Sequence, residues 1–349
     1  MKKITQKVEE TDLWVFITHF DPPRAKIKHY LRDFIIPRIS IGYVRSWLRL
    51  IRHGTRGFQP WKKDIMTLNR RKIEKSRLRF LNNQILMLSQ MNLSSLKIFI
   101  HTNSESVKGL ISENWTELDI SIIVHHHYNK INVLNNSSSF QSESSPWHLT
   151  WEHKKSFLAS FEKAGTSSIF LAIEDDHLFT ETNLEYFLDN KDRLAPLRLI
   201  PSFLQIEFSE VNQHYVSVGL LSKEKIPLTT LPQVLIEDDL FVQLPNPYSG
   251  LIILDYPQAK EYVSSIAFSE FESRQLTWWG IGERAMMGLQ FIDPPKHFSS
   301  RNVLPVNKSQ EGIKTSAWII HQPNLYVQKQ SFARGLTPAK MFLTGQEAQ

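Results

Sequence analysis

The feature that most constrains the fold is a run of five apolar residues, 169–173, which ends in three consecutive acids. A Gly-Thr-Ser-Ser segment precedes the run, and this turn signal predicts a strand that is buried on both faces. Glu174, Asp175 and Asp176 follow directly, so three like charges stand where water is scarce. If the chain stays extended, Glu174 and Asp176 point to one side of the strand and Asp175 to the other.

A cation is the partner that best relieves such crowding of carboxylates. Carboxylate oxygens are the ligands that Mg²⁺ and Mn²⁺ prefer, and these ions in turn bind phosphate oxygens. The carboxyl edge of a parallel sheet is also where α/β proteins bind nucleotides. The sequence therefore predicts a divalent-cation site after this strand. A solvated acidic loop is the alternative that an isolated acidic cluster leaves open.

Composition excludes several kinds of chemistry. The chain of 349 residues contains no cysteine, which excludes disulfides, thiolate catalysis and sulfur-ligated zinc. With 41% hydrophobic and 22% charged residues it has ordinary globular composition, and its length suits one elaborated α/β domain. No run reaches the roughly 20 apolar residues needed to cross a bilayer, and no signal peptide is evident. We therefore expect a cytoplasmic protein.

The positive charge is concentrated in residues 24–79, which hold 17 Lys and Arg against three acids. Within this segment, residues 41–52 place apolar side chains at helical spacing, with Arg45, Arg49 and Arg52 on a neighbouring stripe. Such a helix could bind an anionic membrane surface, as a peripheral protein on the inner face, or hold an acidic substrate. A helix that simply covers the core is an equal alternative. No nucleic-acid-binding motif accompanies the segment, so nucleic acid is not an expected partner.

Strand-like and helical patterns alternate along the first half of the chain. Apolar runs at 13–18, 96–100 and 120–124 predict short buried strands. Residues 70–91 are rich in good helix formers and carry an apolar stripe at helical spacing. Because strand, helix and strand follow one another in this way, we expect a parallel sheet.

Histidines follow the second and third of these strands. His101 comes directly after one, and His125, His126 and His127 follow the other. Such a cluster suggests zinc, but adjacent histidines at a strand exit point to opposite sides, so at most two of the three could share an ion. Histidines without a metal are the favoured interpretation.

A helix is predicted for residues 146–164, with Thr150 as its N-cap and Gly165 just after its end. The first turn carries His153 and Lys154. A helix N-terminus with a lysine nearby is a natural partner for a diphosphate, although a solvated lysine is the commoner case.

A second Glu-Asp-Asp sequence occurs at residues 237–239. It lies in a part of the chain where a short helix at 182–189 precedes a predicted antiparallel meander, with strands at 199–208 and 215–221. The first acidic cluster is the preferred metal site because it follows a helix in strand-helix-strand order, whereas further strand-like residues follow the second.

Two late stretches add candidate residues. Residues 277–288, T-W-W-G-I-G-E-R-A-M-M-G, place paired tryptophans and two glycines before Glu283. Aromatic faces suit sugar rings, glycine lets a backbone approach a ligand, and the carboxylate could accept a hydroxyl proton. His321 ends an apolar run and could bind the same ion as the acids, or be an ordinary loop histidine. Arg301 could contact phosphate, although a structural ion pair is favoured for a lone arginine.

Together these features resemble the metal-dependent GT-A glycosyltransferases over most of residues 13–326. The resemblance rests on the order of buried strands, the I-E-D-D strand exit, the W-W-G-I-G-E-R loop and the late His321. It implies an α/β, Rossmann-like fold with a mostly parallel central sheet flanked by helices, a small antiparallel part and a basic helical insertion. One domain would then comprise a nucleotide-binding half at 13–180 with the insertion at 24–79, an acceptor-binding half at 181–326 and a C-terminal tail at 327–349.

The resemblance also implies roles for individual residues. Asp176 and His321 would bind Mn²⁺ or Mg²⁺, and Glu283 would be the catalytic base of an inverting transfer. The residues assigned to donor binding are Glu174, Asp175, Asn103, His153, Lys154 and Arg301. The implied partners are a nucleotide-sugar donor and a carbohydrate or glycoconjugate acceptor.

Two other functions remain as alternatives. A metal-dependent nucleotidyltransferase could use the same acids, but it would usually carry a glycine-rich phosphate loop after the first strand, and residues 18–23 contain no glycine. A non-catalytic scaffold that binds a membrane surface through the basic segment would bind neither metal nor sugar nucleotide.

Overall fold

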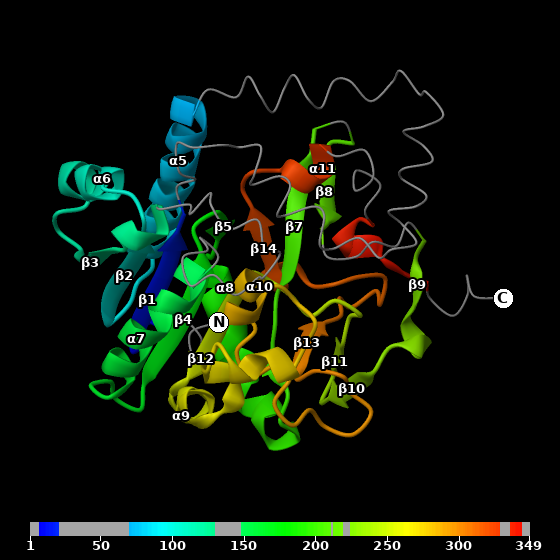
Figure 1. Ribbon diagram of the computed structural model, residues 1–349. Helices are drawn as coiled ribbons and strands as arrows, with labels where there is room; N and C mark the ends of the chain where they lie inside the picture. The colour runs from blue at the N-terminus through cyan, green and yellow to red at the C-terminus, as the bar shows by residue number, and fades with distance from the viewer. Residues whose placement is uncertain are drawn as a thin grey trace, which may run out of the picture.

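The structure is a computed structural model that describes residues 7–20, 70–129, 148–210, 212–218, 224–328 and 336–343 (Figure 1). The predicted basic helix at 41–52 and most of the basic insertion lie outside the described residues. From residue 70 onward the chain forms helix α5 (Arg70–Ser89), as the helical pattern predicts. The other helices described are α6 (Ser106–Asn114), α7 (Leu149–Phe161), α8 (Glu181–Leu194), α9 (Tyr256–Ser264), α10 (Ile281–Ala285) and α11 (Leu325–Gln328).

A mostly parallel sheet, here called sheet A, forms one side of the molecule (Figure 1). Its strands lie in the order β12-β4-β1-β2-β3, and β12 runs antiparallel at one edge while the others are parallel. Their bounds are β1 (Asp12–His19), β2 (Ser95–Thr102), β3 (Asp119–Val124), β4 (Ser168–Glu174) and β12 (Leu251–Asp255). The chain builds outward from β1 to β3 and then returns to the other side of β1 as β4. The predicted α/β class and parallel sheet are confirmed.

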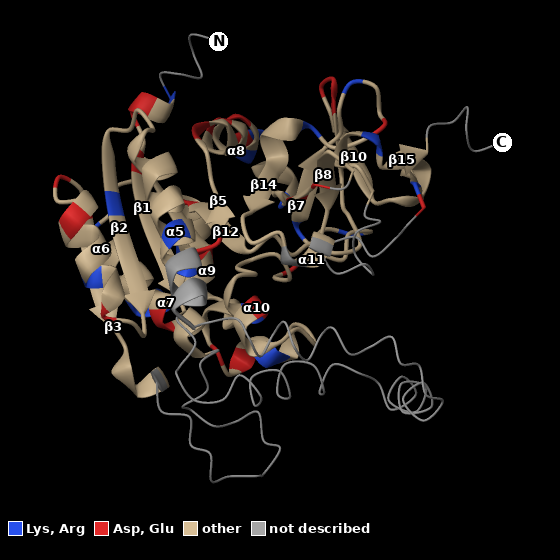
Figure 2. Ribbon diagram, turned by 90° about the horizontal axis from the view of Figure 1, so that it is seen from above, with Lys and Arg blue, Asp and Glu red and all other residues tan. Residues whose placement is uncertain are grey.

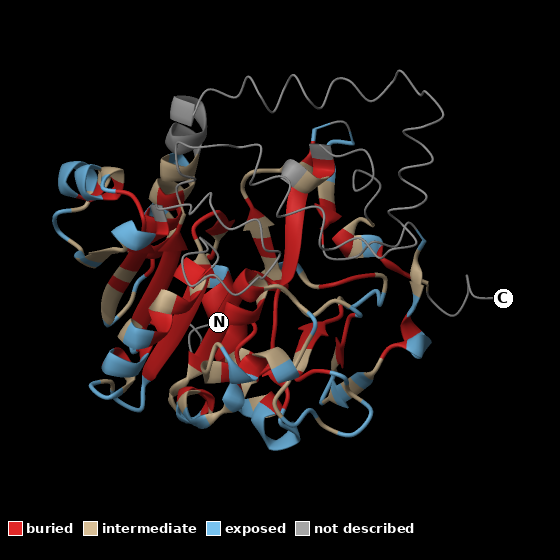
Figure 3. Cartoon of the chain, in the orientation of Figure 1, coloured by how far each residue is buried: buried red, intermediate tan, exposed pale blue. Residues whose placement is uncertain are grey.

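Side chains of sheet A alternate between two cores. On β1, Leu13, Val15 and Ile17 belong to one apolar cluster, to which α5, α6 and α8 contribute. Trp14 and Phe16 belong to another, with side chains of α7 and α9. Figure 3 shows β1, β4 and β12 almost wholly buried, while the edge strand β3 and the outer faces of the helices are more exposed. The continuous apolar runs in the sequence arise because helices cover both faces of this sheet.

Two smaller sheets form the rest of the fold. Sheet B has the strand order β5-β14-β7-β8, and sheet C the order β10-β11-β13-β6. Sheet B comprises β5 (His177–Leu178), β14 (Trp318–His321), β7 (Leu204–Ser209) and β8 (His214–Ser217). Sheet C comprises β10 (Gln233–Ile236), β11 (Asp239–Val242), β13 (Asn302–Pro305) and β6 (Ile200–Pro201). A further parallel pair joins β9 (Ile226–Pro227) to β15 (Phe342–Leu343).

The meander predicted after α8 is only partly correct. Strands β7 and β8 form the expected antiparallel pair, but β6 lies in sheet C and pairs parallel with β13. The distant strand β14 pairs parallel with β7. Sheets B and C are therefore mixed, and each combines segments that are far apart in the sequence.

The ends predicted for α7 are wrong. Its N-cap is His148, without a side-chain cap, and Thr150 lies inside the helix. The helix ends at Phe161, before Gly165 is reached. Helix α8 is longer than predicted, because a capping box between Thr180 and Asn183 fixes its start and good helix formers extend it.

Charged residues lie mainly on helices and loops, while the strands of sheet A carry few of them (Figure 2). Within the part of the chain that the structure describes, no helix combines the length and the apolar character needed to cross a membrane.

Candidate metal centre

The first acidic cluster lies where strand order reverses in sheet A. Strand β4 ends at Glu174, and β5 begins at His177 after a two-residue turn. The parallel neighbour β1 ends at His19. Since β2 and β4 lie on opposite sides of β1, the crevice outside the carboxyl ends of β1 and β4 is a topological switch point. Open α/β sheets bind their ligands at such points.

Asp175 lies in the two-residue turn after β4, so the strand period does not apply to it, and its side chain contacts β1 and α5, where it shares Arg77 with Asp176. Its carboxylate lies 2.6 Å from Nδ1 of His19 and also accepts a hydrogen bond from Arg77 of α5. The Asp175 side chain is 1% exposed. Asp175 therefore links the end of β4 to β1 and α5, which is a positioning role within the fold.

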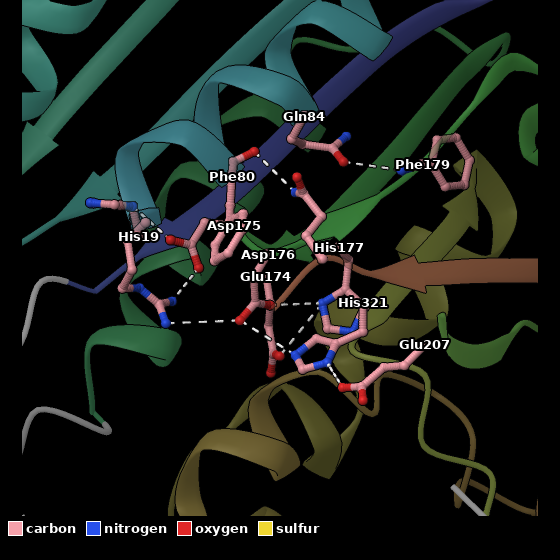
Figure 4. A network of polar contacts seen from close by, with 12 residues as sticks. His19, Phe80, Gln84, Glu174, Asp175, Asp176, His177, Phe179, Glu207 and His321 are labelled. Carbon is pink, nitrogen blue, oxygen red and sulfur yellow. Dashed lines mark hydrogen bonds and ion pairs between the residues drawn. The ribbon is translucent and has the colours of Figure 1, made fainter. Parts of the chain in front are cut away.

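Glu174 and Asp176 share the opposite side with two histidines (Figure 4). Nδ1 of His177 lies 3.1 Å from Oδ1 of Asp176 and 3.7 Å from Oε2 of Glu174. Ligand atoms of these three residues all lie within 4.8 Å of one another. Nε2 of His321 lies 3.5 Å from Oδ2 of Asp176. The structure thus brings the predicted residues Glu174, Asp176 and His321 together and adds His177.

Sheet B sets the positions of both histidines. Strand β14 pairs antiparallel with β5, and His321 is the register partner of His177. On the other side of β14, strand β7 carries Glu207, which is fully buried. Nδ1 of His321 lies 2.5 Å from Oε1 of Glu207, so His321 stands between two carboxylates (Figure 4). A carboxylate on Nδ1 orients an imidazole and leaves Nε2 for a metal ion.

Backbone contacts hold the Glu207 carboxylate in place. It accepts hydrogen bonds from the backbone N–H groups of Tyr326 and Val327, at 3.3 and 2.7 Å. These donors satisfy a buried charge that would otherwise be costly in an apolar strand. The geometry of His321 is therefore fixed before any ligand arrives.

Gly250 packs directly against the ring of His177. A Cβ atom at this position would lie 2.5 Å from ring atoms of His177, and the Gly250 backbone has a φ of +73°. Its carbonyl accepts a hydrogen bond from the backbone N–H of Glu174, at 3.2 Å. Only glycine combines this close approach with a left-handed backbone at no steric cost.

The four side chains perturb one another's protonation. Burial raises the pKa of Glu174 to about 7. The charge of His177 lowers this pKa, and the charge of Asp176 raises it further. Although burial works against charge, Asp176 and Glu207 raise the pKa of His321 to about 10. The reciprocal attraction to His321 and His177 overcomes burial and holds the pKa of Asp176 well below its usual value. In the absence of a cation, His321 and Arg77, whose guanidinium group lies 3.8 Å from Oδ2 of Asp176, are the counter-charges of the acids.

The donor set fits a divalent cation. Oδ1 of Asp176 and both ring nitrogens of His177 are buried and make no hydrogen bond within the described chain. His177 itself is fully buried. Buried polar atoms usually have hydrogen-bond partners, so an unsatisfied carboxylate oxygen of Asp176 and ring nitrogen Nδ1 of His177, 3.1 Å apart, favour a missing ligand. Carboxylate oxygens together with imidazole nitrogens are a donor set that divalent metal ions use in proteins.

A row of aromatic rings extends from the acids to the surface. The hydroxyl of Tyr248 donates a hydrogen bond to Oε1 of Glu174. The Tyr248 ring stacks on Trp279, with centroids 5.7 Å apart, and Trp279 stacks on Trp278 at 4.9 Å. Trp278 is 87% exposed. The predicted tryptophan pair therefore lies next to the acidic cluster.

Glu283 lies in the first turn of α10 and is half-buried. The N–H of the Trp151 ring donates to the backbone carbonyl of Ile281 at 2.9 Å and ties this short helix to α7. Burial, the charge of Glu174 and then that of Glu283 raise the pKa of Tyr248. The Glu283 carboxylate is therefore near enough to Tyr248 for its charge to act on the phenol.

Lys154 and His153 lie inside the fold. The ammonium group of Lys154 donates to the backbone carbonyls of Ala267 and Phe268, at 2.7 and 3.2 Å, and lies 3.9 Å from the ring centroid of Trp151. His153 is fully buried and contacts its own helix through the Thr150 carbonyl at 2.6 Å. Both side chains are thus engaged within the fold, and these contacts do not support the expected role in donor binding.

Arg301 and Asn103 are also buried. The guanidinium group of Arg301 donates to Oε1 of Glu261 at 2.7 Å and to the carbonyl of Arg198 at 2.8 Å. This is the structural ion pair that the sequence offered as the alternative. Asn103 follows the end of β2 and is 2% exposed.

The second acidic cluster is a hairpin turn between β10 and β11. Glu237 has a φ of 55°, and Asp239 begins the second strand. Arg193 and Lys314 neutralise the Asp239 carboxylate, at 2.9 and 2.5 Å. Because these basic side chains already balance the charge, this cluster needs no cation.

Three residues of the centre were missed by the sequence reasoning. His177 directly follows the three acids, and this proximity was a usable signal. Glu207 is a single acid in an apolar strand, which is itself a reason to look for a buried partner. Tyr248 precedes Gly250 in a loop, and no spacing rule connects it to Glu174.

No family model matches the sequence, and a search of curated proteins finds no significant match.

Proposed function

We propose that the protein is a metal-dependent glycosyltransferase with a GT-A-like fold, which moves a sugar from a nucleotide-sugar donor to an acceptor hydroxyl. The observation that carries this proposal is the convergence of Glu174, Asp176, His177 and His321 at the switch point of sheet A. A nucleotide diphosphate needs both a place at the carboxyl edge of the sheet and a neutralising charge. The candidate metal centre lies at that edge of sheet A, and its side chains supply ligands for an ion that neutralises the diphosphate.

In this proposal Asp176, His177 and His321 hold the ion, and Glu174 completes the set on the side of Tyr248. A bound Mn²⁺ or Mg²⁺ supplies Lewis-acid stabilisation of the leaving diphosphate. The protein residues hold their positions through partners behind them, Glu207 for His321 and Gly250 for His177. Such preorganisation is what electrostatic catalysis requires.

The acceptor lies on the aromatic row, where the exposed Trp278, supported by Trp279 behind it, is the platform for a sugar ring. The oxygen of the acceptor hydroxyl attacks the anomeric carbon on the face opposite the leaving diphosphate, and Glu283 accepts the proton of that hydroxyl. This arrangement inverts the configuration at that carbon.

Thermal unfolding with a panel of nucleotides tests the proposal. A ligand that binds only the folded protein raises the melting temperature. We expect at least one nucleoside diphosphate sugar to raise it in the presence of Mn²⁺ and not in the presence of a chelator. The matched variants Asp176→Asn and Asp239→Asn should respectively lose and retain the shift. A shift with nucleoside triphosphates alone would indicate nucleotidyl transfer, and no shift with any nucleotide would refute both enzymes.

A further inference from the structure

We propose that His125, His127 and Glu152 form a second metal site, separate from the acidic centre, which binds a transition-metal ion of the Zn²⁺ class. The three residues offer ligand atoms that all lie within 4.8 Å of one another. Two come from the exit of β3 and one from the first turn of α7. An ion at this point would join the end of a strand to the helix that covers it.

Two of the three consecutive histidines belong to the group, and the chain leaves β3 there through a short 3-10 helix, His126–Asn129. Nδ1 of His125 lies 3.8 Å from Oε2 of Glu152, and His127 contributes to the same group. His126 points elsewhere, and its Nε2 lies 3.0 Å from Oε1 of Glu105. The residue between the two ligands is therefore a built-in control.

A second set of contacts orients the proposed ligands. Nε2 of His125 lies 3.2 Å from Nδ1 of His101, and the two rings stack with centroids 5.4 Å apart. If Nε2 of His125 donates this hydrogen bond, Nδ1 keeps its lone pair and faces Glu152. The hydroxyl of Tyr128 donates to Oε1 of Glu152 at 2.8 Å, which leaves Oε2 as the ligand atom. Partners of this kind are typical of metal-binding histidines and carboxylates.

Burial distinguishes this group from a chance surface cluster. The side chains of His125 and Glu152 are 13% and 12% exposed, and His101 behind them is 2% exposed. His127 is exposed, so solvent reaches the site from that side. Two imidazoles and one carboxylate form a donor set that zinc uses with a fourth, open position. Nitrogen-rich sites favour zinc-like ions over Mg²⁺.

In this structure the ammonium group of Lys155 supplies the positive charge that a metal ion would bring to Glu152. Its ammonium group lies 2.8 Å from Oε2 of Glu152, and its side chain is 79% exposed. An exposed lysine side chain can leave a carboxylate at little cost in free energy, whereas a buried lysine could not. Metal binding would therefore release Lys155 into solvent.

Cobalt and zinc titrations of the full chain test this site. The background is the double variant Asp176→Asn/His321→Gln, which removes two donors from the first centre. We expect this background protein to bind one equivalent of Co²⁺ with a visible d–d spectrum that Zn²⁺ displaces. Adding His127→Gln or Glu152→Gln should weaken Zn²⁺ binding by about 100-fold or more, whereas His126→Gln should leave it unchanged. Circular dichroism establishes that each variant is folded.

Three results would overturn the proposal: no Co²⁺ spectrum in the background variant, undiminished binding with His127→Gln, or equal losses with His126→Gln and His127→Gln. The exposed position of His127 makes its variant unlikely to disturb folding. Lys155→Met gives an independent readout, because it removes a competing cation. It should tighten Zn²⁺ binding, and weaker binding would contradict the assignment of Oε2 of Glu152 as a ligand.

Discussion

His321 lies directly opposite His177 in sheet B, and the centroids of the two rings are 5.1 Å apart. The pairing brings the late strand β14 against β5, which begins just after the acidic turn of β4. Sheet B therefore connects the two parts of the candidate metal centre. A change at any strand of this sheet should affect the centre through the position of a histidine.

Gly250→Ala tests how far the centre depends on its supporting backbone. The new Cβ would lie 2.5 Å from the His177 ring on a backbone with φ +73°, so the ring or the turn must move. We expect a loss of at least about 1–2 kcal/mol in the free energy of unfolding and weaker Mn²⁺ binding. Chemical denaturation and metal titration measure the two effects.

Gly109→Ala is the matched control for that variant. Gly109 lies within α6, and no atom lies within 4 Å of a Cβ built there. Alanine is the better helix former, so this change should stabilise the fold by about 0.5–1 kcal/mol and leave metal binding intact. Equal metal affinity in the two variants would show that Gly250 does not position His177.

Glu283→Gln separates acceptor chemistry from donor binding. The amide keeps the shape of the carboxylate but cannot accept a proton, so turnover should fall by about 10² to 10⁴ while donor affinity barely changes. Calorimetric titration of the donor alongside steady-state kinetics measures both quantities. Unchanged turnover would remove Glu283 from the base position, and lost donor binding would place it in the donor site.

The buried His153 predicts a pH-dependent stability. Burial, with smaller effects from Lys154 and His101, lowers the pKa of His153 to about 3 in the folded protein, against 6.5 in the unfolded chain. Between these values the unfolded chain binds a proton that the folded protein does not, so stability falls as the pH falls below about 6.5. One such group contributes about 1.4 kcal/mol per pH unit.

His153→Leu should remove this contribution. Whatever its stability at neutral pH, the variant should lose about 1.4 kcal/mol less than the wild type for each unit between pH 6 and 4. Urea denaturation at several pH values gives the two slopes. Parallel slopes would mean that His153 is protonated or exposed in the folded protein.

The sequence predicted the parts of the fold that have a local cause. Apolar runs identified β1 to β4, although the edge strand β3 contains no buried residue, contrary to its prediction as a buried strand. The strand period predicted for the three acids does not apply, because Asp175 and Asp176 form a turn. The pairing of β14 with β7 and β5 could not be predicted in this way. Such pairings depend on contacts between distant segments, for which a single sequence carries no periodic signal.

The residues proposed for the candidate site also differ in whether their positions could be predicted from the sequence. Asp176 and His321 both end apolar runs, so their place at strand exits could be predicted from sequence. The burial of Lys154 could not be predicted, because two of the three aromatic rings around its ammonium group come from distant segments, Tyr262 of α9 and Phe268 beyond it. A lysine that reads as solvated in sequence is in fact 5% exposed. Burial by distant segments decides the role of such residues.

The most direct test of the metal centre is a Mn²⁺ titration of the wild type and of two variants that each lack one aspartate. The electron paramagnetic resonance signal of the free ion measures how much Mn²⁺ each protein binds. Asp176→Asn replaces an anionic ligand with an amide and should abolish binding at the centre. Asp239→Asn, which removes the partner of Arg193 and Lys314, should cost about 1 kcal/mol of stability and leave Mn²⁺ binding unchanged. Equal Mn²⁺ binding by the wild type and Asp176→Asn, or its loss in Asp239→Asn alone, would contradict the account.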